Sequence, residues 1–511
     1  MAVSPAKARL KFARLGIDHL WLFGVLASFG ILISLAPQPP HDFWWHLKIG
    51  EMIYSSGMIP CTNLFGWTLP ADTPYVYGAW LADVLFYSIY RLGGVALILF
   101  TRTMLALTAY GLLGYEAYRK SGSWRISGLV TALACLMTAN NLIVRPQNWS
   151  WIPFVIFLIL LSAYVDGQLR GGWLFLCPLM MIFWVNVHGS FILGVVLIGV
   201  FFGGEIIRNI FQIDGFLSWK ALSWIGIVGM LTILAMLVNP QLAGIFPYVV
   251  KLMTDPSSQT LIMEWQSPVL GDLGSVFFFV SILVLITVWA YKRYRPTPSE
   301  TLLILAFLWL AWSGVRYVVW FGMAAMPILA RSLKDILRGR IWVSAPARNF
   351  ANGVLVIVLF IPFVLFQPWL IEKMPLPDQY WSRVWKGSPI GPLLTIDTPI
   401  GAVEYLKDHP GGRLFNHMGH GSYLIWALPE QGVFVDPRVE LYPYDLWLDY
   451  IKISNGLRYN QLLEKYNVDR LLLDVEEQGE LISLLGADPL WRQEYSDAHA
   501  QIWIKEGTRI Q

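Results

Sequence analysis

Long apolar runs alternate with short polar segments from about residue 19 to residue 366 of this 511-residue chain. A helix needs about 20 residues to cross a hydrocarbon core of about 30 Å, and most of these runs approach that length once flanking aromatic residues are counted. The pattern therefore predicts a polytopic α-helical membrane protein with about 11 membrane-spanning helices. The predicted spans are 19–36, 94–113, 126–144, 149–165, 173–185, 191–207, 222–238, 276–290, 302–312, 318–329 and 354–366.

A shorter apolar piece at 79–90 is not counted as a span. It would reach only about 18 Å as a helix, and it contains Asp83. We predict that it lies at the membrane surface or re-enters the membrane from one side. Without it, the basic loops all fall on one side of the membrane, which the positive-inside rule assigns to the cytoplasm. Residues 1–17 are then cytoplasmic, and both the first loop (37–93) and the C-terminal part of the chain are extracytoplasmic.

The apolar runs stop near residue 369. Prolines accumulate over 370–399, which predicts a linker after a transmembrane domain at 18–369. Helical and extended patterns then alternate, as is typical of a small α/β domain, and we place this domain at 400–511. Helical segments are predicted at 401–409, 422–428, 444–454 and 457–466, and extended segments at 413–415, 432–436, 470–474 and 501–505.

Composition agrees with a membrane protein. The chain is 56% hydrophobic and 14% charged, whereas ordinary soluble domains carry about 25% charged residues. The formal net charge of +3 does not indicate nucleic-acid binding. The three cysteines are far apart in the sequence, so neither a disulfide framework nor a Cys-x-x-Cys metal site is predicted.

The segment that follows the first span contains several side chains that can take part in catalysis. Residues 41–47 read His-Asp-Phe-Trp-Trp-His-Leu, which places the Asp42 carboxylate and the His46 imidazole beside two indoles that favour the headgroup layer. An alternative explanation is purely structural, because Asp is a preferred N-cap residue. Asp42 would then cap a surface helix, and the lipid would be faced by Trp45, Ile49, Met52 and Ile53.

Polar residues also occur in the other predicted external loops: Arg145, Asn186, His188, Glu264 and Arg316. A charge at mid-bilayer costs about 2.5–3.5 kcal/mol, so their placement on the side of Asp42 predicts a water-filled cleft there. Each residue also has a structural explanation. The arginines can extend to lipid headgroups, Glu264 can pair with one of them, and His188 can end a helix.

On these residues the chain resembles the GT-C superfamily of integral-membrane glycosyltransferases, which use polyprenyl-phosphate-linked sugars. It looks like an uncharacterised bacterial branch that begins D-x-W-W-H-L, and it is more distantly similar to oligosaccharyltransferases and protein O-mannosyltransferases. A Trp-Trp-Asp motif, which would point to Asn glycosylation, is not found in the C-terminal part. The resemblance rests on Asp42-Phe-Trp-Trp-His-Leu-Lys-Ile-Gly50, Gly57-Met-Ile-Pro60, Phe65-Gly-Trp-Thr68, Arg145-Pro-Gln, Asn186-Val-His-Gly, Asn239-Pro, Glu264-Trp and Asp436-Pro-Arg-Val-Glu-Leu-Tyr442.

The resemblance implies a function. The chain is expected to transfer a sugar, with inversion, from a polyprenyl-phosphate donor to a lipid, glycan or protein acceptor on the outer face of a bacterial plasma membrane. It implies that Asp42 is the catalytic carboxylate of the first loop. Glu264 resembles an acidic residue of a later external loop, and Arg316 resembles a late arginine near the lipid-linked phosphate.

The chemistry requires a base for the acceptor hydroxyl and groups that stabilise the departing phosphate. We predict Asp42 as the base, with His46 orienting it or the acceptor. Mg²⁺ or Mn²⁺, if the reaction uses a metal, would be held by Asp42 and Glu264. Phosphate contacts are predicted for Arg145, Asn186, His188 and Arg316.

A competing hypothesis assigns no catalysis to the chain. It would be a membrane scaffold or assembly subunit that retains the GT-C fold and binds a protein partner through residues 400–511. Asp42→Asn separates the two hypotheses, because a scaffold would tolerate this substitution.

One motif of the C-terminal domain remains. The segment His417-Met-Gly-His-Gly421 separates a predicted strand from a helix, a position where backbone N–H groups can hold an anion. It lacks a complete phosphate-loop or dinucleotide pattern, so it predicts no specific ligand.

Overall fold

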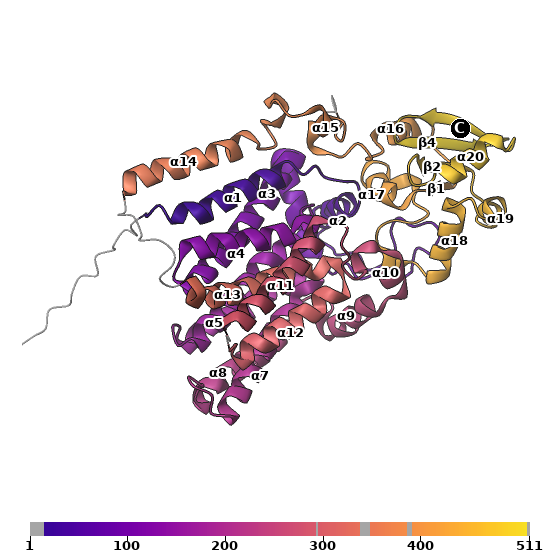
Figure 1. Ribbon diagram of the computed structural model, residues 1–511. Helices are drawn as coiled ribbons and strands as arrows, with labels where there is room; N and C mark the ends of the chain where they lie inside the picture. The colour runs from indigo at the N-terminus through magenta and orange to yellow at the C-terminus, as the bar shows by residue number, and fades with distance from the viewer. Residues whose placement is uncertain (1–14, 293–294, 338–347, 386–390, 508–511) are drawn as a thin grey trace, which may run out of the picture.

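The computed structural model describes residues 15–292, 295–337, 348–385 and 391–507. Helices form the larger part of the molecule, and a small sheet lies at one end (Figure 1). The helices up to residue 365 are α1 (His19–Ser34), α2 (Phe43–Ser56), α3 (Trp80–Ser121), α4 (Trp124–Met137), α5 (Trp151–Val165), α6 (Leu176–Val187), α7 (Ile192–Ile210), α8 (Trp219–Ala235), α9 (Ile245–Thr254), α10 (Pro256–Leu261), α11 (Leu273–Lys292), α12 (Pro298–Ser313), α13 (Val318–Leu337) and α14 (Asn349–Leu365).

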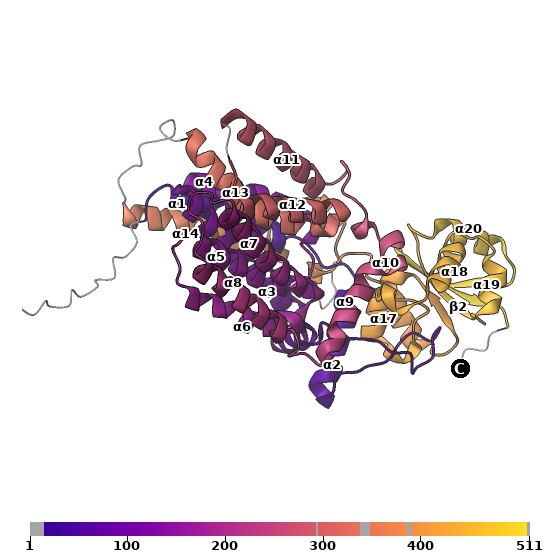
Figure 2. The same cartoon turned by 90° about the horizontal axis from the view of Figure 1, so that it is seen from below.

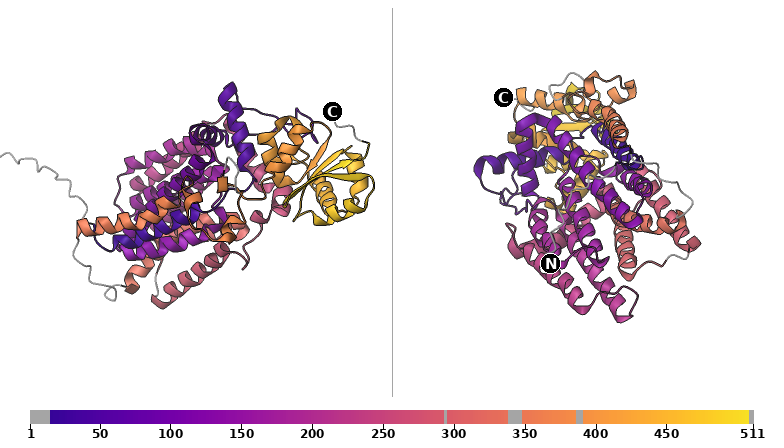
Figure 3. Two further views of the ribbon diagram at one scale, coloured as in Figure 1. Left: turned by 90° about the horizontal axis from the view of Figure 1, so that it is seen from above. Right: turned by 90° about the vertical axis from the view of Figure 1, so that its left-hand side faces the viewer.

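The remaining elements belong to the linker and the C-terminal part of the chain. The described elements there are α15 (Asp378–Trp381), α16 (Ile400–Asp408), β1 (Leu414–Asn416), α17 (Met418–Ala427), α18 (Tyr444–Ser454), α19 (Tyr459–Lys465), β2 (Arg470–Asp474), α20 (Gly479–Ala487), β3 (Trp491–Ser496) and β4 (Ala500–Lys505). In the left view of Figure 3 the helical bundle and the yellow sheet lie at opposite ends of the molecule.

The predicted fold class is confirmed: each predicted span coincides with a described helix. Among the residues that the structure describes, four helical segments are long and apolar enough to cross a membrane by length and composition. The other apolar helices there are shorter, so the number of spans agrees only loosely with the prediction. Large apolar side chains are exposed on several of these helices, among them Met230, Trp309 and Phe350. Such a surface suits lipid rather than water.

Part of the topology prediction falls outside the described residues. The basic segments at 1–14 and 338–347 both lie outside the described residues. The cytoplasmic side of the bundle and the domain boundaries therefore stay predictions.

The short apolar piece that was not counted as a span forms the first part of α3. Helical geometry breaks at Gly93 and Gly94. Gly94 has φ 62° and ψ −160°, a combination open in practice only to glycine. Asp83 therefore lies on a helical segment that is distinct from the span after the break.

The C-terminal domain is built on a four-stranded sheet with the order β1-β2-β4-β3. β1 and β2 are parallel, and β4 is antiparallel to both β2 and β3. The extended segment predicted at 432–436 is not a strand of this sheet. Val433 instead makes an isolated bridge to Gly66 of the first loop, so this prediction was wrong in its pairing. Strand β3 and helix α20 were not predicted.

The first loop and the C-terminal domain are packed together. Trp44 is fully buried against the rings of Tyr423 and Trp426, which belong to α17. The backbone N–H of Trp45 donates to Oγ of Ser422 at 3.1 Å. The two indoles predicted for the headgroup layer therefore lie inside the protein, because α17 covers this face of α2. The alternative in which α2 presents an apolar face to lipid was also wrong, since buried positions include Trp45, Ile49 and Ile53.

A buried ion pair reinforces this junction. The guanidinium of Arg438 donates to both carboxylate oxygens of Asp436, at 2.9 and 2.7 Å, and to the hydroxyl of Tyr77 in the first loop at 3.1 Å. Tyr442 donates to the same carboxylate at 2.6 Å. The Asp-Pro-Arg-Val-Glu-Leu-Tyr motif thus joins the first loop to the C-terminal domain. Seen from below, α9 and α10 lie between the helical bundle and the C-terminal domain (Figure 2), and α10 contacts α18.

Candidate functional site

Asp42 occupies the N-cap position of α2, but its side chain makes no capping hydrogen bond. Its Oδ2 lies 3.1 Å from Nε of Arg145, and the side chain remains 27% exposed. The helix-cap explanation therefore accounts for the position of Asp42 in the chain and not for its carboxylate, which faces a cluster formed by other loops.

Gln38 fixes the chain just before this carboxylate. Its backbone N–H donates to the carbonyl of Leu393 at 2.8 Å, and its carbonyl accepts from Thr395 at 3.0 Å. Its side-chain oxygen accepts from the N–H of Val144 at 2.8 Å. Because Val144 precedes Arg145, one buried glutamine ties the linker, the Asp42 segment and the Arg145 segment together.

Arg145 bridges two carboxylates. Its Nε pairs with Asp42, and its Nη1 donates to Oε2 of Glu264 at 2.6 Å. Glu264 thus pairs with an arginine, as its structural explanation expected. The guanidinium neutralises both acids, and a divalent ion shared by them would have to displace it. This arrangement does not fit Mg²⁺ or Mn²⁺ at Asp42 and Glu264.

His46 is held by an acid that the sequence did not assign to the site. Its Nδ1 lies 2.7 Å from Oδ1 of Asp83, and both side chains are buried. The helices α2 and α3 approach closely because Gly50 has no side chain, and a methyl group there would overlap the backbone carbonyl of Asp83. A carboxylate on one ring nitrogen fixes the orientation of the imidazole, as in many catalytic histidines.

Asn186 and His188 lie at the turn between α6 and α7, and they differ in how their polar atoms are used. The amide of Asn186 accepts from Trp80 Nε1 and donates to the carbonyls of Ile182 and Val238, each at 2.8 Å. Asn186 therefore holds helix ends together. Nδ1 of His188 accepts from the N–H of Ser190 at 3.0 Å, which leaves Nε2 as the protonated nitrogen of the neutral ring.

His188 stays neutral because of its surroundings. Burial, followed by the charge of Arg316, lowers the pKa of His188 to about 3. In an unfolded chain a histidine takes up its proton near pH 6.5. Only the unfolded state then binds this proton between about pH 6.5 and pH 3, so the contribution of His188 to folding stability decreases as the pH falls through that window.

We expect His188→Gln to lose less thermal stability than the wild type when the pH is lowered from about 7.5 to about 5. Thermal unfolding of both proteins at the two pH values measures this difference. His409→Gln, which removes a partly exposed ring that stacks on Tyr405, is the control and should respond like the wild type. An equal loss in His188→Gln and wild type would contradict a neutral, partly buried His188.

Arg316 lies on the short helical turn Val315–Tyr317. Its guanidinium lies over the ring of Trp265 at 4.7 Å, and among the described residues no carboxylate lies within ion-pair distance of it. The N–H of Val315 donates to the carbonyl of Gln266 at 2.9 Å, which fixes this turn against the turn that carries Glu264. Within the described part of the chain, Arg316 is therefore a fixed cation that makes no ion pair.

The charges on these loops act on Asp42. Burial by itself raises the pKa of Asp42, but nearby positive charges, above all Arg145, outweigh it and hold the pKa below its usual value. Asp42 is therefore ionised at neutral pH. The weaker contributions come from His46, His41 and Arg316.

An apolar cavity of about 790 Å³ lies along the helical bundle, and none of the charged residues above lines it. Helices α1, α4 and α14 supply most of its lining, with side chains such as Phe29, Cys135 and Leu355. The lining also includes Leu142, which lies close in the chain to Arg145. A cavity lined almost entirely by apolar groups suits a hydrocarbon chain.

Comparison with solved structures identifies the architecture. The oligosaccharyltransferase of Archaeoglobus fulgidus in its apo form superimposes with a TM-score of 0.52 at 12% identity, over 96% of this chain and 75% of that one. The arabinofuranosyltransferase AftD from Mycobacteria gives 0.54 at 13% identity, over 97% of this chain and 40% of that one. The chain has the GT-C fold.

A second structure of the Archaeoglobus fulgidus enzyme, AglB in complex with an inhibitory peptide and a dolichol-phosphate, gives a TM-score of 0.51 at 12% identity, over 90% of this chain and 69% of that one. No protein-family model and no curated protein sequence matches the chain. The GT-C assignment is thus carried by the fold, and the predicted resemblance to this superfamily is confirmed at that level.

Proposed function

We propose that this GT-C protein transfers a sugar from a polyprenyl-phosphate donor to an acceptor hydroxyl on the outer face of a plasma membrane. The observation that carries the proposal is the Asp42 carboxylate. It lies at a helix start without capping it and pairs with Arg145. The same site contains Arg316, which has no carboxylate within ion-pair distance among the described residues. This is the pair of charges that glycosyl transfer from a phosphate requires.

The reaction follows from these groups. The acceptor oxygen attacks the anomeric carbon, and the bond between that carbon and the phosphate oxygen breaks. The electron pair of this bond leaves with the polyprenyl phosphate, and Asp42 takes the acceptor proton. Arg316 stabilises the negative charge on the departing phosphate, for which a planar guanidinium offers two parallel donors.

The neighbouring histidines act by orienting groups and donating hydrogen bonds, not by carrying charge. His46 is oriented by Asp83 at 2.7 Å and is placed on the first turn of the helix that Asp42 begins, so it can orient the acceptor. Neutral His188 offers Nε2–H as a donor to the donor phosphate or the acceptor. Arg145 holds Asp42 in place, and no step in this scheme uses a metal ion.

The apolar cavity along α1, α4 and α14 accounts for the lipid part of the donor. Its volume of about 790 Å³ accommodates part of a prenyl chain, while the headgroup would reach the loops that carry Arg145 and Arg316. An archaeal enzyme of the same fold is known with dolichol-phosphate bound, which supports a ligand of this class. We further propose, from the charge bias of the loops, that the N-terminus is cytoplasmic and the C-terminal domain extracytoplasmic, as in a bacterial inner membrane.

We expect Arg316→Gln to weaken the binding of undecaprenyl phosphate about 10- to 100-fold, because a hydrogen bond to a charged group contributes about 1.5–3 kcal/mol. The measurement is a titration of the purified full-length protein in nanodiscs, with undecaprenol as the ligand that lacks the phosphate. Arg91→Gln is the matched control, since Arg91 also stacks on a ring, that of Tyr54 at 5.1 Å. Equal affinities for phosphate and alcohol, or an unaffected Arg316→Gln, would contradict the assignment of Arg316.

A further inference from the structure

A second cluster of chemically active side chains lies in the C-terminal domain, on residues that the transfer reaction does not use. His417 directly follows β1, His420 lies in the first turn of α17, and Asp474 ends β2. The strands β1 and β2 are parallel neighbours. Their carboxyl ends therefore meet at one edge of the sheet, which is the edge where open α/β sheets bind their ligands.

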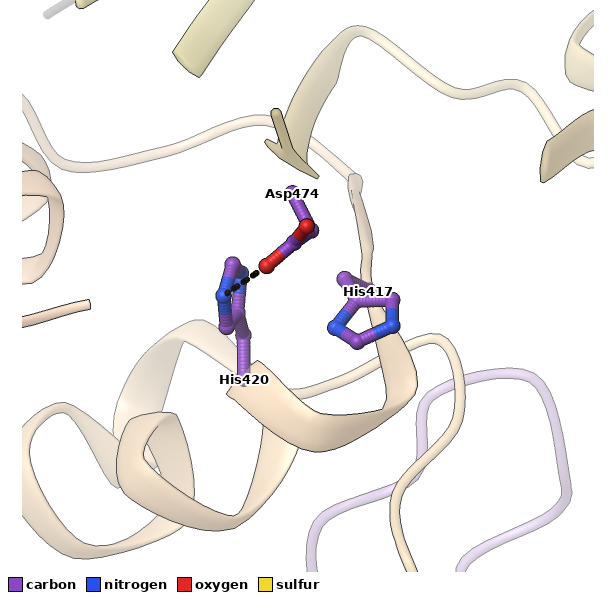
Figure 4. A group of neighbouring side chains, drawn as sticks. All are labelled: His417, His420 and Asp474. Carbon is purple, nitrogen blue, oxygen red and sulfur yellow. Dashed lines mark ion pairs between the residues drawn. The ribbon is translucent and has the colours of Figure 1, made fainter. Parts of the chain in front are cut away.

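The three side chains face a common point (Figure 4). One potential ligand atom from each residue lies within 4.8 Å of the others, and all three residues are buried. Nε2 of His420 is 3.4 Å from Oδ2 of Asp474. Two ligands of a tetrahedral zinc ion are separated by about 3.3 Å, given metal–ligand distances of about 2.0–2.2 Å, so this pair already has the spacing of zinc ligands.

The hydrogen bonds around the cluster leave the required atoms unused. Oδ1 of Asp474 accepts the backbone N–H groups of Glu476 and Glu477, at 2.9 and 2.8 Å, which leaves Oδ2 toward His420. Nδ1 of His420 and Nδ1 of His417 are buried and have no hydrogen-bond partner among the described residues, and Nε2 of His420 meets only the Asp474 carboxylate, at 3.4 Å. A buried polar atom without a partner is unusual in a folded protein and calls for an explanation such as a bound ion.

The remaining nitrogen of His417 has a partner of the kind that metal sites use. Its Nε2 lies 2.9 Å from Oε2 of Glu477. Histidine ligands commonly donate their second N–H to a carboxylate, which fixes the ring and raises its basicity. His417 would thus bind through Nδ1 and be oriented by Glu477. Imidazole together with one carboxylate selects zinc and its transition-metal neighbours over magnesium or calcium.

We propose that His417, His420 and Asp474 bind one Zn²⁺ ion, with water as the fourth ligand and Glu477 orienting His417. The site adjoins the first loop, because a methyl group placed on Gly419 would lie 3.4 Å from Nδ1 of His417 and 3.7 Å from Nδ1 of His41. His41 immediately precedes Asp42. Zinc at this edge therefore stabilises the junction between the C-terminal domain and the turn that carries Asp42.

The test uses the full-length protein without an affinity tag, stripped with a chelator and dialysed against Zn²⁺ alone. Metal analysis should find one zinc per chain in the wild type and in the control His409→Gln, and less than about a tenth in His420→Gln and Asp474→Asn. Co²⁺ in place of zinc should give the visible absorption of a tetrahedral site. Glu477→Gln should keep the metal but bind it about 10- to 100-fold more weakly.

Folding is checked by thermal unfolding of each metal-free variant. Zinc should raise the Tm of the wild type and of His409→Gln but not that of His420→Gln. Should His420→Gln fail to fold, the less buried His417→Gln takes its place. The proposal is overturned if the wild type takes up no zinc, or if a folded His420→Gln or His417→Gln retains one equivalent. Neither result bears on the transferase, whose test measures polyprenyl phosphate at Arg316.

Discussion

We expect Asp42→Asn to lower the proposed sugar transfer by about 10²- to 10⁴-fold, the range that a positioned general base contributes. The amide has the shape of the carboxylate, but it cannot take the acceptor proton. Loss of the Asp42 carboxylate also leaves Glu264 as the only acid that pairs with Arg145 among the described residues. Turnover is measured as polyprenyl phosphate released when membranes that contain each protein are given a panel of polyprenyl-phosphate sugars. Binding of undecaprenyl phosphate should change much less than turnover.

Asp18→Asn is a close control for this experiment. Asp18 also occupies the N-cap position of a membrane helix without a side-chain capping bond, and it pairs with Nε of Arg125. It lies at the end of α1 that precedes the span, away from the Asp42 segment. Full turnover in Asp42→Asn, with a protein that folds and binds lipid, would contradict the assignment of Asp42 as the base. Absence of turnover in the wild type itself would instead favour the scaffold hypothesis.

Arg438→Met lowers the free energy of unfolding by about 3–5 kcal/mol, because it leaves the fully buried carboxylate of Asp436 without its cation. The same change removes the bond from Arg438 to Tyr77, so the first loop loses a tie to the C-terminal domain. Chemical unfolding, followed by tryptophan fluorescence, measures the loss. Protease cleavage within the first loop should become faster at the same time.

Two further variants show whether the burial of this ion pair is the cause. Arg492→Met removes an arginine that is 63% exposed and paired with Glu494, and surface pairs of this kind contribute about 0–1 kcal/mol. Replacing both partners, as in Asp436→Leu with Arg438→Met, removes the unpaired charge and should recover much of the stability. A loss in Arg438→Met no larger than in Arg492→Met would contradict the proposed role of the ion pair.

The membrane helices could be predicted because length and hydropathy are local properties of the sequence. The same reasoning failed at Trp44 and Trp45. An aromatic residue has the same apolar character whether it faces lipid or another helix, and only α17, distant in the sequence, decides that these two are buried. Strand β3 was missed for a related reason. It lies at the edge of the sheet, and most of its side chains are not buried, so it lacks a clear apolar pattern.

The sequence predicted which residues belong to the candidate site better than it predicted the contacts between them. Asp42, Arg145, Glu264 and Arg316 were found from polar residues in loops and from the resemblance to GT-C enzymes. That Arg145 bridges two acids is a property of three loops that only the fold brings together. Asp83 was noticed as a reason against a span, and its bond to His46 depends on the close approach of α2 and α3 at Gly50. The His417, His420 and Asp474 cluster likewise depends on the pairing of β1 with β2.

The central claim is that Asp42 and Arg316 form one site for a lipid-linked phosphate. The most direct measurement is a cryo-electron microscopy structure of the full-length protein in nanodiscs with undecaprenyl phosphate. We expect phosphate density within hydrogen-bond distance of the Arg316 guanidinium, beside the Asp42 carboxylate, with prenyl density entering the apolar cavity between α1, α4 and α14. Density for the phosphate elsewhere, or a site filled by the protein's own side chains or by a helix of another protein, would contradict the account.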